Sequence, residues 1–116
     1  MAASSVAPYM GRTVSADIFQ AVYDRLAAIE GGAHPDLAAR SILRHTAGGI
    51  QLLGIATEGA RAICYDPHLH QVYAVDVSPI GVHLADRELW ETNVDDPTDW
   101  AAQHAGRFAW RHPRVR

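Results

Sequence analysis

In the first third of the chain, apolar residues recur at steps of three and four positions, which is the spacing of one side of an α-helix. These apolar positions are Ile18, Phe19, Val22, Leu26 and Ile29. Thr13 or Ser15 can cap the start, because a hydroxyl oxygen accepts a hydrogen bond from a free backbone N–H of the first turn. The pattern therefore predicts a first helix that begins near Thr13 and ends at Gly31-Gly32.

A second helical pattern begins at His34-Pro35-Asp36. Proline suits the first turn of a helix, where the N–H that it lacks would have no intrahelical partner. The expected inner face comprises Leu37, Ala38, Ile42 and, as its last member, His45. Gly48-Gly49 ends this predicted helix.

The middle of the chain changes to short runs rich in Ile, Leu, Val and Tyr, separated by the turn sequences TEG and DPHLH. The expected strands are Ile50–Ile55, Ala60–Tyr65 and Gln71–Val77, with a short fourth strand over Gly81–Ala85. Ser78-Pro79 interrupts the ladder before the fourth strand, because proline cannot donate a hydrogen bond to it. This punctuation is typical of an antiparallel meander.

Side chains of the third run alternate between the two faces of the predicted sheet. Val72 and Ala74 face one way, whereas Tyr73, Val75 and Val77 face the other. At least one face of the sheet is therefore suited to burial.

A last helix is predicted after Asp96-Pro97, which combines a capping side chain with a first-turn proline. It passes through Trp100 to about Ala105 and ends at Gly106. The predicted fold class is α+β: two N-terminal helices, an antiparallel meander of three or four strands and a C-terminal helix, with the sheet covering the helices on one face.

The chain of 116 residues has room for one domain. We expect residues 1–12 to form a flexible arm, residues 13–106 a single α+β domain, and residues 107–116 a basic aromatic tail. A content of 48% hydrophobic and 20% charged residues excludes a disordered chain, a collagen repeat and a disulfide scaffold.

The expected cellular location is inferred from the lack of membrane-spanning and secretory patterns in the sequence. No apolar run approaches the ~20 residues that span a bilayer, and the first residues show no secretory pattern. We therefore expect a cytoplasmic protein without a membrane partner. Cys64 is the only cysteine, which excludes an internal disulfide and a zinc site built mainly from thiolates.

The charge is divided unevenly along the chain. Residues 107–116 contain four of the ten arginines and no acid, so removing their charge from the total of −3 leaves −7 for residues 1–106. The tail interleaves these arginines with Phe108 and Trp110, and such residues can contact phosphates and bases. We expect a terminal strand or tail that packs Phe108 and Trp110 onto the domain instead, because the acidic body opposes a polyanion. A partner-docking arm is the alternative, and nucleic-acid binding is not expected.

A polar cluster lies in the second hairpin turn. Asp66, His68 and His70 could share a metal ion, since residues two apart in an extended segment point the same way. The alternative is a solvated turn, because Asp-Pro is a common turn opener. A pair of histidines without a third ligand at the usual spacing is weak, so we expect no cofactor.

No complete catalytic apparatus is recognisable. Cys64 lies near acidic and imidazole side chains, but in a strand it is expected to be a buried thiol. The phosphate-binding glycine–lysine motif is excluded because the chain contains no lysine. We assign no catalytic residue.

Tryptophan is enriched at the centres of protein interfaces. Trp90 lies among Arg87, Glu88 and Glu91, and is the first candidate for a partner contact. From the tail, Trp110 and Arg111 join this predicted partner-binding set.

The stretch LLGIATEGARAICYDPHLHQVYAVDV resembles the hairpin segment of the SUKH immunity superfamily, small bacterial proteins that bind and neutralise toxins. The resemblance is carried by Gly59, Ile63, Cys64, Asp66, Val72 and Tyr73. It implies a noncatalytic protein-binding module that acts as an immunity or inhibitor protein.

Three functional hypotheses remain open at this point. The first is a noncatalytic module that binds a protein partner through an acidic surface. The second is a small-molecule or metal-assisted enzyme with a pocket near the second hairpin turn, using His68, His70, Asp66 or His83. The third is a structural subunit, and the sequence leaves homo-oligomer formation open.

Overall fold

Two amphipathic helices open the described part of the chain. The computed structural model describes residues 13–28, 34–58, 61–78 and 81–115, so the predicted arm over residues 1–12 lies outside it. Helix α2 spans Thr13–Ala27 and α3 spans Pro35–Thr46, with its proline in the first turn as predicted. Both predicted helices are confirmed, whereas Ile29 and the predicted end of the first helix at Gly31-Gly32 lie outside the described residues.

The inner face of α3 differs from the prediction at one residue. Ala38, Ala39 and Ile42 are buried, whereas Leu37 is 52% exposed. The prediction of Leu37 as an inner residue was wrong, because each helical step turns by about 100° and Leu37 lies one step outside the Ala38–Ala39–Ile42 face. The small side chains allow α3 to pack closely.

Five antiparallel strands follow. They are β1 (Gln51–Ala56), β2 (Arg61–Asp66), β3 (Gln71–Ser78), β4 (Gly81–Glu91) and β5 (Phe108–Arg111). Their order in the sheet is β4-β3-β2-β1-β5. The predicted meander is confirmed, and β5 extends it at the far edge by pairing with β1. Part of the segment predicted as a tail is thus a strand of the sheet.

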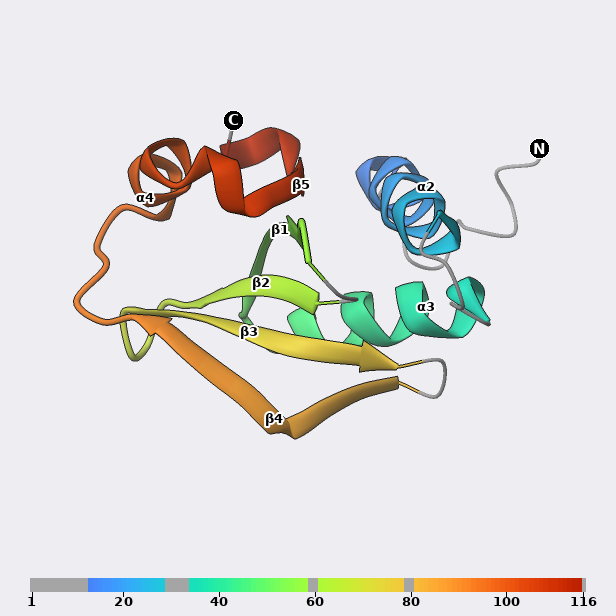
Figure 1. The fold of residues 1–116 in the computed structure, drawn as a ribbon, viewed down its shortest axis with the longest axis horizontal. Helices are drawn as coiled ribbons and strands as arrows, with labels where there is room; N and C mark the ends of the chain where they lie inside the picture. The colour runs from blue at the N-terminus through green and yellow to red at the C-terminus, as the bar shows by residue number, and fades with distance from the viewer. Residues whose placement is uncertain (1–12, 29–33, 59–60, 79–80, 116) are drawn as a thin grey trace.

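Both faces of the sheet are covered. The cluster under α2 and α3 includes Ile55, Cys64, Tyr73 and Val75 from the sheet. The cluster on the other face contains Leu53, Ile63, Tyr65 and Val72, with Trp100 of helix α4 (Pro97–Gln103) and Val115 of the C-terminal turn η3 (Pro113–Val115). Figure 1 shows α2 and α3 on one side of the molecule and α4 on the other.

Two parts of the sequence-based interpretation are settled by these clusters. The alternation of Val72 against Tyr73 and Val75 is confirmed, because they enter opposite clusters, whereas the side chain of Val77 lies outside the described part. The expectation of helices on one face alone was wrong: α4 packs on the second face, since Leu53, Ile63 and Val72 make that face apolar as well.

Strand β4 is longer and less regular than predicted. Ala74 of β3 lies opposite Glu88, and Asp76 of β3 lies opposite His83. The register therefore shifts between these two pairs, and β4 has more residues than β3 over this stretch. A second shift occurs between Val72 and Tyr73. Bulges of this kind bend and twist an edge strand. The last part of β4, which carries Trp90, is thereby brought alongside α4. The ring centroids of Trp90 and of Trp100 on α4 are 6.4 Å apart.

Candidate functional site

The turn between β2 and β3 is organised by Asp66. Its Oδ1 accepts hydrogen bonds from the backbone N–H of His68 at 2.8 Å and of Leu69 at 3.2 Å. Aspartate commonly holds a turn in this way. Its Oδ2 lies 3.8 Å from the guanidinium of Arg87, so the largely buried carboxylate has a cationic neighbour.

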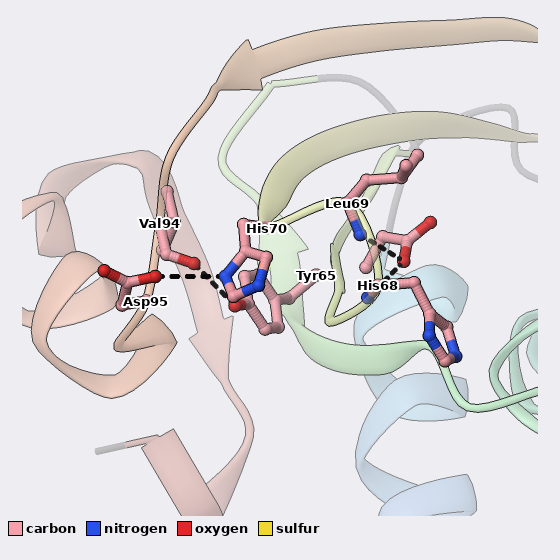
Figure 2. Close-up of polar contacts among 7 residues, drawn as sticks. Tyr65, His68, Leu69, His70, Val94 and Asp95 are labelled. Carbon is pink, nitrogen blue, oxygen red and sulfur yellow. Dashed lines mark hydrogen bonds and ion pairs between the residues drawn. The ribbon is translucent and has the colours of Figure 1, made fainter.

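This turn is fastened to the connection between β4 and α4. The backbone N–H of Val94 donates to the carbonyl of His70 at 2.8 Å, and the Tyr65 hydroxyl donates to the carbonyl of Val94. His70 Nδ1 lies 3.0 Å from Asp95 Oδ1. Figure 2 shows these contacts converging between the two segments. We call residues 66–70 and 91–96 together the tip.

The tip presents one exposed apolar side chain and an exposed carboxylate. Leu69 is 57% exposed and the Asp95 side chain is 90% exposed. Four carboxylates, and no arginine, occur in residues 91–103: Glu91, Asp95, Asp96 and Asp99. Burial, and then the charges of Asp95, Asp66 and Asp96, raise the pKa of the Tyr65 phenol.

Sequence reasoning did not single out Leu69 or Asp95. The available signal was a leucine between two histidines in a turn that is otherwise polar. A single exposed leucine is common on protein surfaces and does not by itself indicate a function. Its meaning comes from the contacts that hold the turn in place, and these join segments more than 20 residues apart, such as Tyr65 and Val94.

The predicted metal ligands share one turn but do not converge. Asp66 is engaged by the turn amides and faces Arg87, while His70 points to Asp95. The His68 imidazole points away from His70 in Figure 2. Among the residues that the structure describes, no three His, Cys, Asp or Glu side chains are grouped so that they could hold a metal ion. His83 falls in β4, but its side chain lies outside the described part.

The predicted partner-binding residues of β4 are held in an exposed stack. The Trp90 indole N–H donates to Glu88 Oε1 at 2.7 Å, and Arg61 forms an ion pair with the same carboxylate. The Arg107 guanidinium carbon lies 3.6 Å from the Trp90 ring centroid. The hydrogen bonds from Trp90 and then Arg61 hold the pKa of Glu88 below its ordinary value.

The stack and the tip both contact Trp100 of α4. The Oε1 of Glu91, a residue of the tip, accepts a hydrogen bond from the Trp100 indole N–H at 3.4 Å, and the Trp90 and Trp100 ring centroids are 6.4 Å apart. Glu88 and Trp90 therefore lie on the side of the molecule that carries the tip.

The other predicted partner-binding residues do not join this stack, although Arg87 faces Asp66 of the tip at 3.8 Å. The Arg87 guanidinium carbon lies 3.6 Å from the centroid of Tyr73, which belongs to the cluster under α2 and α3. Trp110 and Arg111 lie on β5, the opposite edge of the sheet, where Trp110 packs against that same cluster. The six predicted residues thus do not form one continuous surface.

Cys64 is buried next to a polar pair that sequence analysis did not identify. The Tyr73 hydroxyl lies 2.8 Å from His45 Nε2. Burial raises the pKa of the Cys64 thiol to about 12, and burial followed by the charge of Arg87 lowers the pKa of His45. A thiol with such a pKa is protonated near neutral pH and is a poor nucleophile.

A cavity of about 380 Å³ lies at the start of β1, between α3, α4 and the C-terminal turn. The described residues that line it include none of Asp66, His68 and His70. The histidine-bearing turn therefore does not open into this cavity.

Comparisons of this chain with family models, curated proteins and solved structures found no match. Within the described ranges, no helix has both the length and the apolar character needed to cross a membrane.

Proposed function

We propose that this chain is a noncatalytic protein-binding module whose tip docks on a basic partner protein. The observation that carries the proposal is the exposed Leu69, held by a cross-braced turn on the same tip as the exposed Asp95. A surface that is ordered before binding loses less conformational entropy on association. Recognition surfaces also commonly combine apolar residues with a polar rim.

Electrostatics favour a cationic partner. Residues 91–103 carry four carboxylates without an arginine, and the net charge of the chain is −3. Such a field accelerates encounter with a basic surface and repels acidic ones, including nucleic acids. The side chains of Glu88, Trp90 and Glu91 extend the same side of the molecule, so they serve as the outer part of the contact.

We further propose that binding neutralises the partner, as an immunity or inhibitor protein does. The SUKH resemblance supports this proposal, and its segment includes the turn Asp66–His70. The chemistry of that segment points the same way. Asp66 is occupied by turn amides and the Cys64 thiol is buried with a raised pKa, so both serve the fold rather than turnover.

The test is affinity capture from the native host with the full chain as bait. We expect one specific protein to be retained in mild salt, and Leu69→Ser and Asp95→Lys each to reduce its retention about tenfold or more. Leu37→Ser is the matched control, because Leu37 is similarly exposed but lies on α3. Equal retention by the two leucine variants would refute the tip as the binding surface.

A second measurement tests neutralisation separately. The captured protein is expressed and its toxicity or enzymatic activity is titrated with the purified chain. Inhibition that is complete at one equivalent, and weaker with Leu69→Ser, is expected. Binding without inhibition would leave a binding module and remove the immunity or inhibitor role.

A further inference from the structure

The cavity at the start of β1 exists because β5 covers only part of that strand. The pairing of β1 with β5 runs from Gly54 to Ala56, whereas Gln51 and Leu52 line the cavity. The chain leaves the sheet after His112 and forms the C-terminal turn, which becomes one wall. A volume of about 380 Å³ lies within the range of small-molecule sites.

The lining combines apolar walls with hydrogen-bonding groups. The apolar part is formed by Ile18, Leu43, Ile50, Leu52 and Val115. Gln51, Thr98, His112 and Arg114 contribute polar groups, whereas the hydroxyl of Thr46 in the lining already donates to the carbonyl of Leu43 at 2.9 Å. Apolar walls with a few convergent polar groups are the ordinary composition of a site for a small organic molecule.

The charge of the cavity is opposite to that of the chain. The lining includes Arg114, and among the described residues that line it none is acidic. Asp96 and Asp99 flank Thr98 in sequence, but both carboxylates accept hydrogen bonds within α4, from Asp99 N–H and the Gln103 amide. A cation at an otherwise neutral, partly apolar cavity favours an anion with an apolar body.

His112 has a fixed role in this wall. Its Nδ1 accepts a hydrogen bond from the backbone N–H of Arg114 at 3.0 Å, which holds the C-terminal turn in shape. In the neutral imidazole, the proton then resides on Nε2. The wall that carries Arg114 is therefore ordered without help from a ligand.

We propose that this cavity binds a small monocarboxylic acid that has an apolar ring or chain. Its carboxylate pairs with the Arg114 guanidinium, with the Thr98 hydroxyl as a hydrogen-bond donor, since the Thr46 hydroxyl already donates to the Leu43 carbonyl. Its apolar body lies against Leu43, Ile50 and Leu52. This site is separate from the tip and does not depend on the proposed protein partner.

The experiment uses 3-phenylpropionate as the probe and 3-phenylpropionamide as its uncharged isostere. Binding to the full chain is followed by backbone amide chemical shifts in a titration. We expect saturable shifts at Gln51, Leu52, Thr98 and Arg114 with the acid, and about tenfold weaker binding of the amide, because a charge-assisted hydrogen bond is lost.

Three variants make the result specific. Arg114→Gln should weaken binding of the acid about tenfold and leave binding of the amide unchanged. Arg44→Gln removes the same charge from α3, outside the lining, and should leave the affinity for both probes unchanged. Leu69→Ser should bind both probes as the unaltered chain does. Equal affinity for acid and amide, equal weakening by Arg44→Gln, or absence of saturable shifts would overturn the proposal.

Discussion

Gly54 is the residue at which the sheet closes on its last strand. It lies opposite Arg111 in the pairing of β1 with β5. A Cβ at this position would overlap the backbone carbonyl oxygen of Trp110 and come within 2.6 Å of Phe108 Cδ2. A backbone oxygen in a paired strand cannot move aside cheaply, so only glycine permits this close approach.

We therefore expect Gly54→Ala to lower the free energy of unfolding by about 2–3 kcal/mol, because β5 must shift away from β1. Gly48→Ala is the control, since a Cβ there meets nothing within 4 Å, and it should change stability by less than about 0.5 kcal/mol. Urea unfolding measures both variants. If Gly54→Ala left the free energy of unfolding nearly unchanged, β5 would be able to move away from β1 without loss of stability.

His45 makes the stability of the fold depend on pH. Its pKa lies below the ordinary value of 6.5, first because of burial and second because of Arg87, so the folded state favours the neutral imidazole. Below pH 6.5 the unfolded chain binds the proton more readily than the folded chain does. The contribution of His45 is therefore fully present above its ordinary pKa and is lost as the pH falls.

The expected outcome is a smaller loss of stability on acidification in His45→Gln than in the unaltered chain, measured by urea unfolding at about pH 7.5 and about pH 5. Glutamine keeps a hydrogen-bonding group next to the Tyr73 hydroxyl but does not titrate. His68→Gln is the matched control, because that imidazole is exposed, and its pH dependence should follow the unaltered chain. If His45→Gln lost as much free energy of unfolding on acidification as the unaltered chain, His45 would not be the source of the pH dependence.

At the scale of elements, the tip depends on one strand-to-loop contact. The buried Tyr65 hydroxyl donates to the backbone carbonyl of Val94. The backbone N–H of Val94 donates in turn to the backbone carbonyl of His70. The β2–β3 turn and the β4–α4 connection thus support one another.

Tyr65→Phe should destabilise the fold by about 1–2 kcal/mol, since it leaves the Val94 carbonyl without its partner. Hydrogen exchange should accelerate at Val94 more than at amides of α3, because the effect is local to the tip. Tyr23→Phe on α2 provides the control, because that ring packs against Phe19 and the cluster under α2 and α3, not at the tip. Uniform acceleration across the molecule would contradict a local brace.

The elements that sequence analysis predicted well are those with strong local signals. Periodicity located α2, and proline after a polar residue located the starts of α3 and α4. Strand β4 was predicted as Gly81–Ala85 but continues to Glu91, because its charged final residues are tolerated at the edge of a sheet.

The candidate site was less predictable, for a physical reason. Asp66, His68 and His70 were recognised as a cluster, but their orientation depends on Arg87, Asp95 and the turn amides. Trp90 was recognised as a contact residue, and its stack with Arg107 joins β4 to the C-terminal segment. Such contacts between distant segments are set by packing of the whole chain, which local patterns do not encode.

At the scale of the whole molecule, the last segment belongs to the core on both faces. Phe108 and Val115 pack on the α4 side, and Trp110 packs under α2 and α3. Full burial of a large apolar side chain contributes about 1.5–3 kcal/mol, and of these three only Val115 is fully buried, whereas Phe108 and Trp110 are partly buried. Their sum is a large fraction of the total stability of an ordinary domain.

Deletion of residues 107–116 should therefore abolish cooperative thermal unfolding, as followed by circular dichroism. A chain with Arg107→Gln and Arg114→Gln that keeps both aromatic rings should still unfold cooperatively, since those arginines are exposed. A deleted chain that unfolds cooperatively would show that this segment is an appendage rather than part of the core.

The position of β5 beside β1 has a kinetic consequence. Neighbouring strands of the meander are joined by short turns, whereas β1 meets β5 only after the whole meander and α4 have been traversed. Closing such a long loop costs entropy before any contact compensates for it. We expect the β2–β3 hairpin to form early and β5 to dock late, so substitutions in β5 should speed unfolding while leaving the folding rate nearly unchanged.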